Sequence, residues 1–175
     1  MSRIFLQLTV FQIAIWLTML IVIRLVFIFI YIPMSVITEN LPHLPLALRN
    51  IVRFDSQVCA YAAVPLLLLG LPLLVVANKR LCRFFTVFTQ WYSMVVVMAI
   101  TLLGCVDLGF YHNFGSHINS TFFDFFKEEP LSLIESIWNE YPVIRMIAII
   151  IGCLWTTWRV NSLLIKNLNI TEHCE

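Results

Sequence analysis

Four apolar runs, each long enough to cross a membrane as a helix, divide this sequence. They lie at about residues 5–32, 58–77, 85–106 and 143–160. A helical span needs about 20 mostly apolar residues, and an open strand would leave its backbone amides unpaired in lipid. With 61% hydrophobic and 12% charged residues, the chain is also far less charged than soluble domains, which have about 25%. The sequence therefore predicts an all-α integral membrane protein whose single domain, residues 1–175, holds four transmembrane helices.

Basic residues in the short connections predict the orientation of these spans. The connection NKRLCR, residues 78–83, carries three basic side chains and no acid, whereas residues 107–141 carry six acids and a single basic residue, Lys127. Connections rich in lysine and arginine stay on the cytoplasmic side. We therefore expect residues 78–83 and both termini to be cytoplasmic. The first run is too long for a signal peptide and is interpreted as a retained span.

The second run and the connection before it leave two alternatives open. Residues 33–57 contain three prolines and then ALRNIVRFDS, which is typical either of a short interfacial helix or of an extended entry into the second span. Within PLLLLGLP, Pro65, Gly70 and Pro72 interrupt the apolar run. A membrane bundle tolerates such residues, so the run forms either a kinked span or a broken span whose last turns begin at Pro72.

An acidic, aromatic-rich segment at residues 107–142, here called the collar, separates the third and fourth runs. Ser132 and Glu135 have the spacing of a capping box, and apolar residues from Leu131 to Tyr141 recur at helical intervals. This pattern predicts an amphipathic helix on the outer leaflet, anchored by Trp138 and Tyr141. Four phenylalanines between residues 122 and 126 predict a second, shorter interfacial segment.

Charged residues near the ends of the spans are the candidate functional residues. Arg24 is the one charge well inside an apolar run, and an ionisable group at membrane depth is a functional candidate. We expect it to lie near the outer boundary and to snorkel or contact a lipid phosphate, since the first run is longer than the hydrocarbon layer is thick. A hairpin of the third and fourth spans would bring Asp107 and Arg145 together, as an ion pair or around a lipid headgroup.

Several kinds of chemistry find no support in the sequence. The formal net charge of +1 does not indicate a nucleic-acid surface. The five cysteines form no C-x-x-C pair, and His112 and His117 lack the spacing of ligands on one helix face. No nucleophile elbow, phosphate-binding loop or catalytic triad pattern is present. We therefore assign no catalytic, cofactor-binding or metal-binding residue in this chain.

Three segments carry a resemblance to a known family. RFDSQVCAYAAVPLLLLGLPLL, DLGFYHNFGSHINSTFFDFFKEEP and IESIWNEYP, spread over about residues 53–158, resemble the N-terminal membrane region of lipoteichoic acid synthase-like proteins of the sulfatase superfamily. The resemblance implies a location in the bacterial cytoplasmic membrane. It also implies spans that carry an extracytoplasmic domain, which transfers phosphoglycerol or phosphoethanolamine from a lipid donor.

This chain departs from the family pattern in its chemistry. Family members have five spans followed by a domain with a threonine nucleophile and a divalent metal such as manganese, and no residue here matches either the nucleophile or the metal ligands. The resemblance thus implies a membrane anchor that lacks the catalytic domain, holds no cofactor of its own and is inactive alone. Whether the chain is part of an enzyme stays open at this point.

Two further functions remain as alternatives to a membrane anchor. One is a non-enzymatic small integral membrane protein that binds lipid or a partner protein, and the other is a transporter fragment, which Arg24 and the interrupted second span favour. In each case we expect membrane lipid to be the partner, and for the enzyme anchor this includes a lipid-phosphate donor. Nucleic acid is not an expected partner. The expected lipid-headgroup or interface contacts are Arg24, Arg53, Asp107, Trp138, Tyr141 and Arg145.

Overall fold

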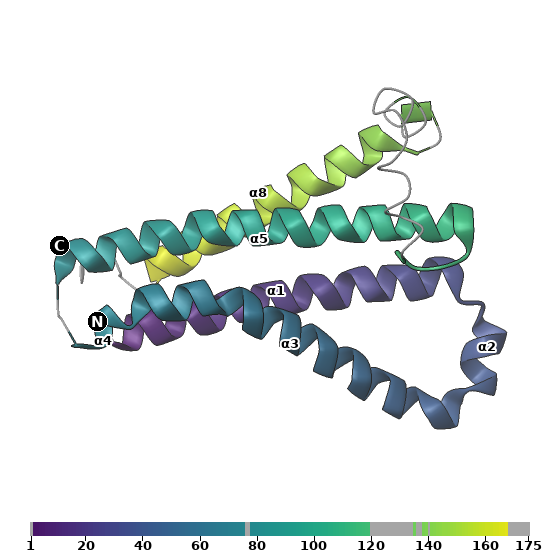
Figure 1. Ribbon diagram of the computed structural model, residues 1–175, viewed down its shortest axis with the longest axis horizontal. Coiled ribbons are helices and arrows are strands. Elements are labelled where there is room, and N and C mark those ends of the chain that lie inside the picture. Colours follow the sequence, from purple (N-terminus) through teal and green to yellow (C-terminus); the bar gives the residue numbers. More distant parts are fainter. Residues whose placement is uncertain (1, 76–77, 120–134, 136–137, 140, 168–175) are drawn as a thin grey trace.

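The computed structural model describes residues 2–75, 78–119, 135, 138–139 and 141–167, and over these residues all regular structure is helical. Four long helices, shown in Figure 1, make up the molecule: α1 Ser2–Tyr31, α3 Leu44–Gly70, α5 Lys79–Phe114 and α8 Val143–Asn167. All four are long and apolar enough to cross a membrane. The prediction of an all-α membrane protein with four spans is confirmed.

Over residues 2–75, three short helices lie at the ends of the long ones. The α2 helix, Met34–Glu39, and the 3-10 helix η1, Leu41–His43, connect α1 to α3, and α4, Pro72–Val75, follows α3. In Figure 1 the α2 segment bridges the widest opening of the molecule, between the end of α1 and the start of α3. The connection predicted at residues 33–57 is therefore helical almost throughout.

The α1 and α5 helices run parallel and keep one register along the bundle. The Trp16 indole donates a hydrogen bond to Ser93 Oγ at 3.2 Å, and the Tyr31 hydroxyl donates to the Leu108 carbonyl at 2.9 Å. Both pairs are 77 residues apart, so the offset between the two helices hardly changes over their shared length. The α3 and α8 helices run in the opposite direction, with α3 on α1 and α8 on α5.

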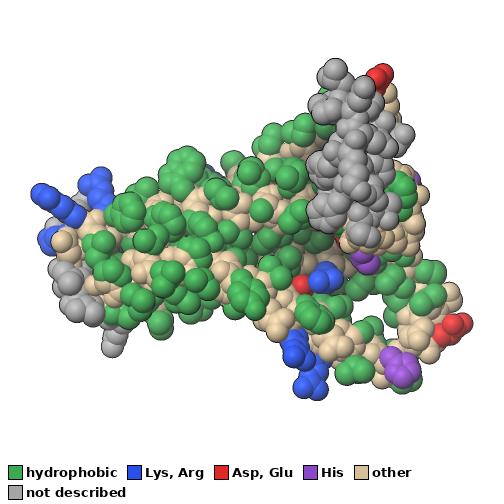
Figure 2. Space-filling view, in the orientation of Figure 1, with side chains coloured by type: hydrophobic (Ala, Val, Ile, Leu, Met, Phe, Trp, Pro, Cys, Tyr) green, Lys and Arg blue, Asp and Glu red, His purple; other side chains and the backbone are tan. Residues whose placement is uncertain are grey.

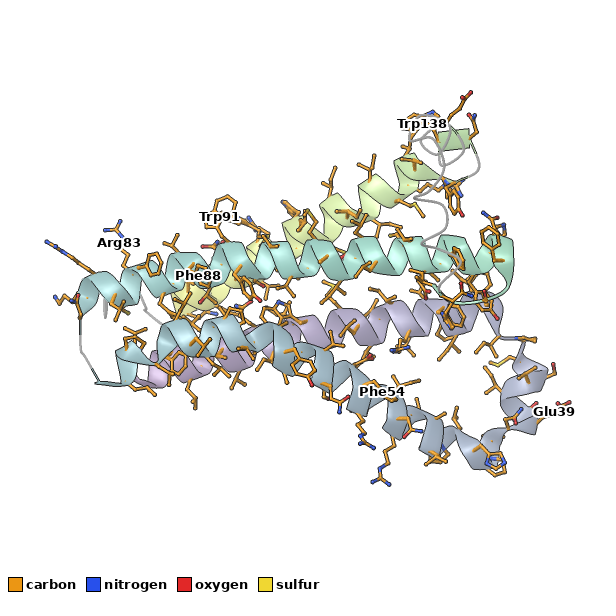
Figure 3. The ribbon with its side chains drawn as sticks, viewed as in Figure 1. Glu39, Phe54, Arg83, Phe88, Trp91 and Trp138 are labelled. Carbon is orange, nitrogen blue, oxygen red and sulfur yellow. The ribbon has the colours of Figure 1, made fainter. Side chains whose placement is uncertain are left out.

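The two ends of the bundle differ in charge. We call the end where α5 starts the basic end, since Lys79, Arg80 and Arg83 lie in the first turns of α5. The opposite end, where α1 and α5 finish and α8 begins, is the collar end. Figure 3 places Arg83 and Trp138 at these opposite ends. In Figure 2 hydrophobic side chains cover the middle of the bundle between them, as expected of a surface that faces lipid.

The α3 helix begins earlier than the predicted second span. Of the two alternatives for the segment before that span, the extended entry is therefore wrong, because the segment is helical. It starts at Leu44, and its first buried residue is Asp55. The turns before Asp55 angle away from α1, as Figure 1 shows, and leave side chains such as Phe54 exposed. The second spanning helix is therefore longer than the predicted run at its start, and its first turns do not pack in the bundle.

The α3 helix also ends earlier than predicted, because the chain breaks at a proline. The helix stops at Gly70, and Pro72 opens the short helix α4. Proline has no backbone N–H to donate to the carbonyl four residues before it, so the helical ladder is interrupted there. Pro65, by contrast, lies inside the helix. Of the two alternatives, the broken span is the one that forms.

The α5 helix is longer than the predicted third span at both ends, which corrects the boundary of the collar. At its start the Asn78 side chain accepts a hydrogen bond from the Arg80 amide at 2.9 Å. At its end Gly115 adopts φ 64, a left-handed conformation that favours glycine, and its amide donates to the Tyr111 carbonyl. Residues 107–114 were predicted to belong to the collar, but they form the last turns of α5.

Two clusters of buried side chains hold the bundle together. The cluster nearer the basic end contains Phe5, Leu8, Leu73, Cys82 and Phe85, and the central cluster contains Trp16, Cys59, Ala63, Leu66 and Val97. In the first cluster the Phe5 ring lies directly on Gly70, where an added Cβ would come within 1.9 Å of the ring. Glycine is required at this position because it lets α1 and α3 approach closely.

Candidate functional site

The candidate site is built around a charge pair between α1 and α3. The Arg24 guanidinium meets the Asp55 carboxylate in a two-pronged contact: Nε donates to Oδ2 at 2.9 Å, and Nη2 donates to Oδ1 at 2.8 Å. The Asp55 side chain is only 2% exposed, whereas that of Arg24 is 45% exposed. A parallel arrangement of two N–H···O bonds is the strong geometry for an arginine and a carboxylate.

This pair adds a partner that the sequence analysis did not assign to Arg24. Its charge is matched by a buried aspartate of the neighbouring helix, while the expected contact with a lipid phosphate stays a prediction for its exposed part. Arg24 lies about 10 Å from the end of α1 at Tyr31, taking 1.5 Å per residue. At such a depth a charge is costly unless it is paired, which explains why Asp55 points inward.

Sequence reasoning missed Asp55 because it placed residues 33–57 in a connection outside the membrane. The signal was present in the spacing. Asp55 precedes Cys59 and Ala63 at intervals of one helical turn, and these three residues share the buried face of α3. Continuing the helix backwards from the second apolar run would have placed a carboxylate on the face that meets the first span.

Asp107 takes part in a second polar contact, and this overturns the predicted pair with Arg145. Its Oδ2 lies 2.8 Å from Nδ1 of His117, and its Oδ1 accepts a hydrogen bond from the Ile118 amide at 3.0 Å. The chain turns back after Gly115, which brings His117 onto the last turns of α5. Asp107 therefore fastens this turn to the helix.

Aromatic rings cover the collar end of α1 and α5. The Phe27 ring centroid lies 4.7 Å from those of Tyr111 and His117, and the Tyr31 and Tyr111 centroids are 4.9 Å apart. Edge-to-face and offset arrangements of this kind are favourable for aromatic pairs. Phe27 and Tyr31 follow Arg24 by one and two turns of α1, so these rings lie between the Arg24–Asp55 pair and the end of the bundle.

Three of the predicted lipid contacts surround one hollow at the start of α8. The hollow has a volume of about 390 Å³ and is lined by Trp138, Tyr141, Pro142, Val143, Ile144 and Arg145. Tyr141 is positioned by α5, because its ring covers Gly109, where an added Cβ would come within 2.6 Å of it. Within the described part of the chain, Arg145 makes no ion pair. The hollow thus combines two interfacial aromatic side chains with an exposed cation.

The remaining candidates fall elsewhere. Arg53 is exposed on the part of α3 that angles away from the bundle, two positions before the buried Asp55. The six predicted lipid contacts therefore do not form one site. Arg24 is paired with Asp55, Asp107 is paired with His117, and Arg145 lines the hollow with Trp138 and Tyr141. The phenylalanines at 122–126 lie outside the described residues. So does most of the predicted amphipathic helix from Leu131 to Tyr141, of which only Glu135, Trp138, Asn139 and Tyr141 are described.

The described residues offer no cluster of three or more His, Cys, Asp or Glu side chains that would hold a metal ion. Among the described cysteines, Cys59, Cys105 and Cys153 are free thiols, and the first two are buried. Each behaves as a small apolar side chain in a helix interface.

Comparisons with protein-family models, with curated proteins and with solved structures found no match to this chain. What the residues establish is an all-α, multi-pass membrane protein of four spans, with a buried aspartate paired to a half-exposed arginine and a second, exposed arginine at the collar end.

Proposed function

We propose that this chain is the membrane-embedded part of a lipoteichoic acid synthase-like transferase of the sulfatase superfamily, and that its collar end holds the headgroup of the lipid donor. The observation that carries the proposal is the hollow at the start of α8, where Trp138, Tyr141 and the exposed Arg145 meet. The sequence resemblance over about residues 53–158 supports the family, and it implies a phosphoglycerol or phosphoethanolamine donor.

The chemistry of the hollow suits a phospholipid headgroup. The Arg145 guanidinium presents several N–H donors to phosphate oxygens, and charge-assisted hydrogen bonds of this kind are stronger than neutral ones. Trp138 and Tyr141 have the amphipathic rings that prefer the headgroup level of a membrane. In this proposal the four helices anchor the enzyme and the hollow orients the donor lipid toward an extracytoplasmic domain, which supplies the nucleophile and the metal.

Lipid binding at Arg145 tests the site. We expect Arg145→Gln to weaken binding of phosphatidylglycerol to the purified chain by about tenfold, the effect of losing about 1.4 kcal/mol of phosphate contact. Binding is measured by native mass spectrometry of the protein in detergent with graded amounts of lipid. Arg145→Lys keeps the charge and should retain part of the affinity.

The matched control is Arg53→Gln, which removes an exposed arginine from α3, away from the hollow. A specific site requires Arg145→Gln to lose more lipid than Arg53→Gln does, whereas equal losses would mean general attraction of lipid to positive charge and would remove the proposed site. The enzymatic part is tested separately in the nucleotide sequence beyond the codon for Glu175. A metal-binding sulfatase-superfamily domain in the same reading frame supports it, and a stop codon leaves a non-enzymatic lipid-binding membrane protein.

Orientation is a second expected result of the proposal. We propose that the basic end faces the cytoplasm of a bacterium and the collar end faces outward, since the basic end carries Lys79, Arg80 and Arg83. In a variant whose native cysteines are replaced, a cysteine at Ser116 should react with an impermeant maleimide added to intact cells. A cysteine at Lys79 should react only after the membrane is opened, and the reverse pattern would refute this orientation.

A further inference from the structure

Among the residues that the structure describes, three buried side chains in the basic half of the bundle each have a polar atom with no hydrogen-bond partner. These atoms are Gln12 Oε1, Thr89 Oγ1 and Asn161 Nδ2. The three residues are 2%, 1% and 2% exposed, and they come from α1, α5 and α8 respectively. Buried polar atoms are normally paired, above all within a membrane, where bulk water does not reach them.

The hydroxyl of Thr89 differs from the neighbouring threonines in its bonding. Thr86, Thr101 and Thr157 each donate the hydroxyl to the backbone carbonyl four residues before them, at 2.7–3.0 Å. This is the usual way in which a helix satisfies a buried threonine. Thr89 makes no such bond, although it lies on the same helix as Thr86 and is more deeply buried. Its hydroxyl is therefore available to a group outside its own helix.

The register of the helices brings the three residues to one level. Trp16 of α1 is hydrogen-bonded to Ser93 of α5, and one helical turn toward the basic end from this pair lie Gln12 and Thr89. Asn161 reaches the same level, because Gln12 Nε2 donates a hydrogen bond to Asn161 Oδ1 at 2.9 Å. The contact of Trp91 with Trp158, with ring centroids 5.8 Å apart, aligns α5 and α8 in agreement with this.

The unpaired atoms require a ligand that both donates and accepts hydrogen bonds. Asn161 Nδ2 donates, Gln12 Oε1 accepts, and the Thr89 hydroxyl does either. A cation does not fit, since the three side chains include no carboxylate and the amide N–H group points the positive end of its dipole at the ligand. Turning both amides over exchanges the roles of Gln12 and Asn161 but again leaves one donor and one acceptor.

We propose that a water molecule is bound between Gln12, Thr89 and Asn161 and joins α1, α5 and α8. Water accepts a hydrogen bond from one amide, donates one to the other and makes a third with the threonine hydroxyl, which is the usual number for a buried water. The site completes a polar link between α8 and α1, helices that are otherwise connected mainly through α5. Polar side chains of this kind add to close packing in holding helices together in lipid, where the hydrophobic effect does not drive helices toward one another.

Nuclear magnetic resonance of the full chain in detergent micelles tests the site without altering it. The Asn161 side-chain amide protons should show a direct nuclear Overhauser effect to water, with the sign expected of a bound molecule. The side-chain amide of Asn40, which is exposed in the connection after α2, gives the reference for contact with bulk water. Absence of the Asn161 signal in the native protein would show a dry contact and overturn the proposal.

The partner residues are tested by two matched variants. Thr89→Val keeps the shape of the side chain but removes its hydroxyl, and it should abolish or strongly weaken the signal between Asn161 and water. Thr86→Val removes a hydroxyl that is bonded to its own helix, so it should leave the signal unchanged. An unweakened signal in Thr89→Val would overturn the three-residue site, because water would then be held without the threonine.

Discussion

Replacing Arg24 with leucine should destabilise the bundle by about 3–5 kcal/mol, because the substitution leaves the Asp55 carboxylate buried without its counter-charge. Asp55 is 2% exposed and receives both prongs of the guanidinium, so the carboxylate loses its paired cation and two charge-assisted hydrogen bonds. The free energy of unfolding is measured on the purified chain by reversible denaturation in mixed detergent micelles. The change should appear as a lower midpoint with unchanged cooperativity.

Two further variants show whether the loss comes from the pair itself. The double variant Arg24→Leu with Asp55→Leu removes both charges, and it should recover much of the stability that the single variant loses. Arg53→Leu removes an exposed arginine from the same part of α3 and should change the stability by no more than about 0.5 kcal/mol. If Arg24→Leu is no more destabilising than Arg53→Leu, the charge pair does not hold α3 to α1.

Replacing Trp16 with alanine should have an effect of similar size, about 3–5 kcal/mol, for a different reason. Trp16 is 0% exposed and lies at the centre of the cluster where α1, α3 and α5 meet. Helices in lipid are held together largely by close packing, so a cavity that lipid chains do not enter loses contacts with no compensation. The same unfolding measurement in micelles gives the change.

The exposed Trp155 is the matched control, since it is 65% exposed on α8 and its replacement by alanine leaves no internal cavity. Trp16→Phe separates packing from hydrogen bonding, because it keeps most of the ring but removes the indole N–H that Ser93 accepts. This change should cost about 1 kcal/mol beyond its loss of volume. Equal effects of Trp16→Ala and Trp155→Ala would contradict the packing of α1 at the centre of the bundle.

The candidate site was only partly predictable from the sequence. The candidates Trp138, Tyr141 and Arg145 are close together in the chain, and they do line one hollow. The predicted partner of Asp107 was wrong, since a histidine after the αL turn at Gly115 binds it in place of Arg145. The chain folds back over the end of α5 because Gly115 adopts a left-handed conformation. The simple hairpin of the third and fourth spans that we expected from the sequence does not include this turn.

The sequence by itself determined the all-α class and the number and approximate place of the spans. These follow from local hydrophobicity, because lipid forces each apolar run to satisfy its own backbone as a helix. Only the tertiary structure decided which polar groups meet. Arg24 and Asp55 are 31 residues apart and Gln12 and Asn161 are 149 apart, and their pairing depends on the rotation and register of whole helices. Those are set by packing at positions such as Gly70 and Trp16, which hydrophobicity along the chain does not encode.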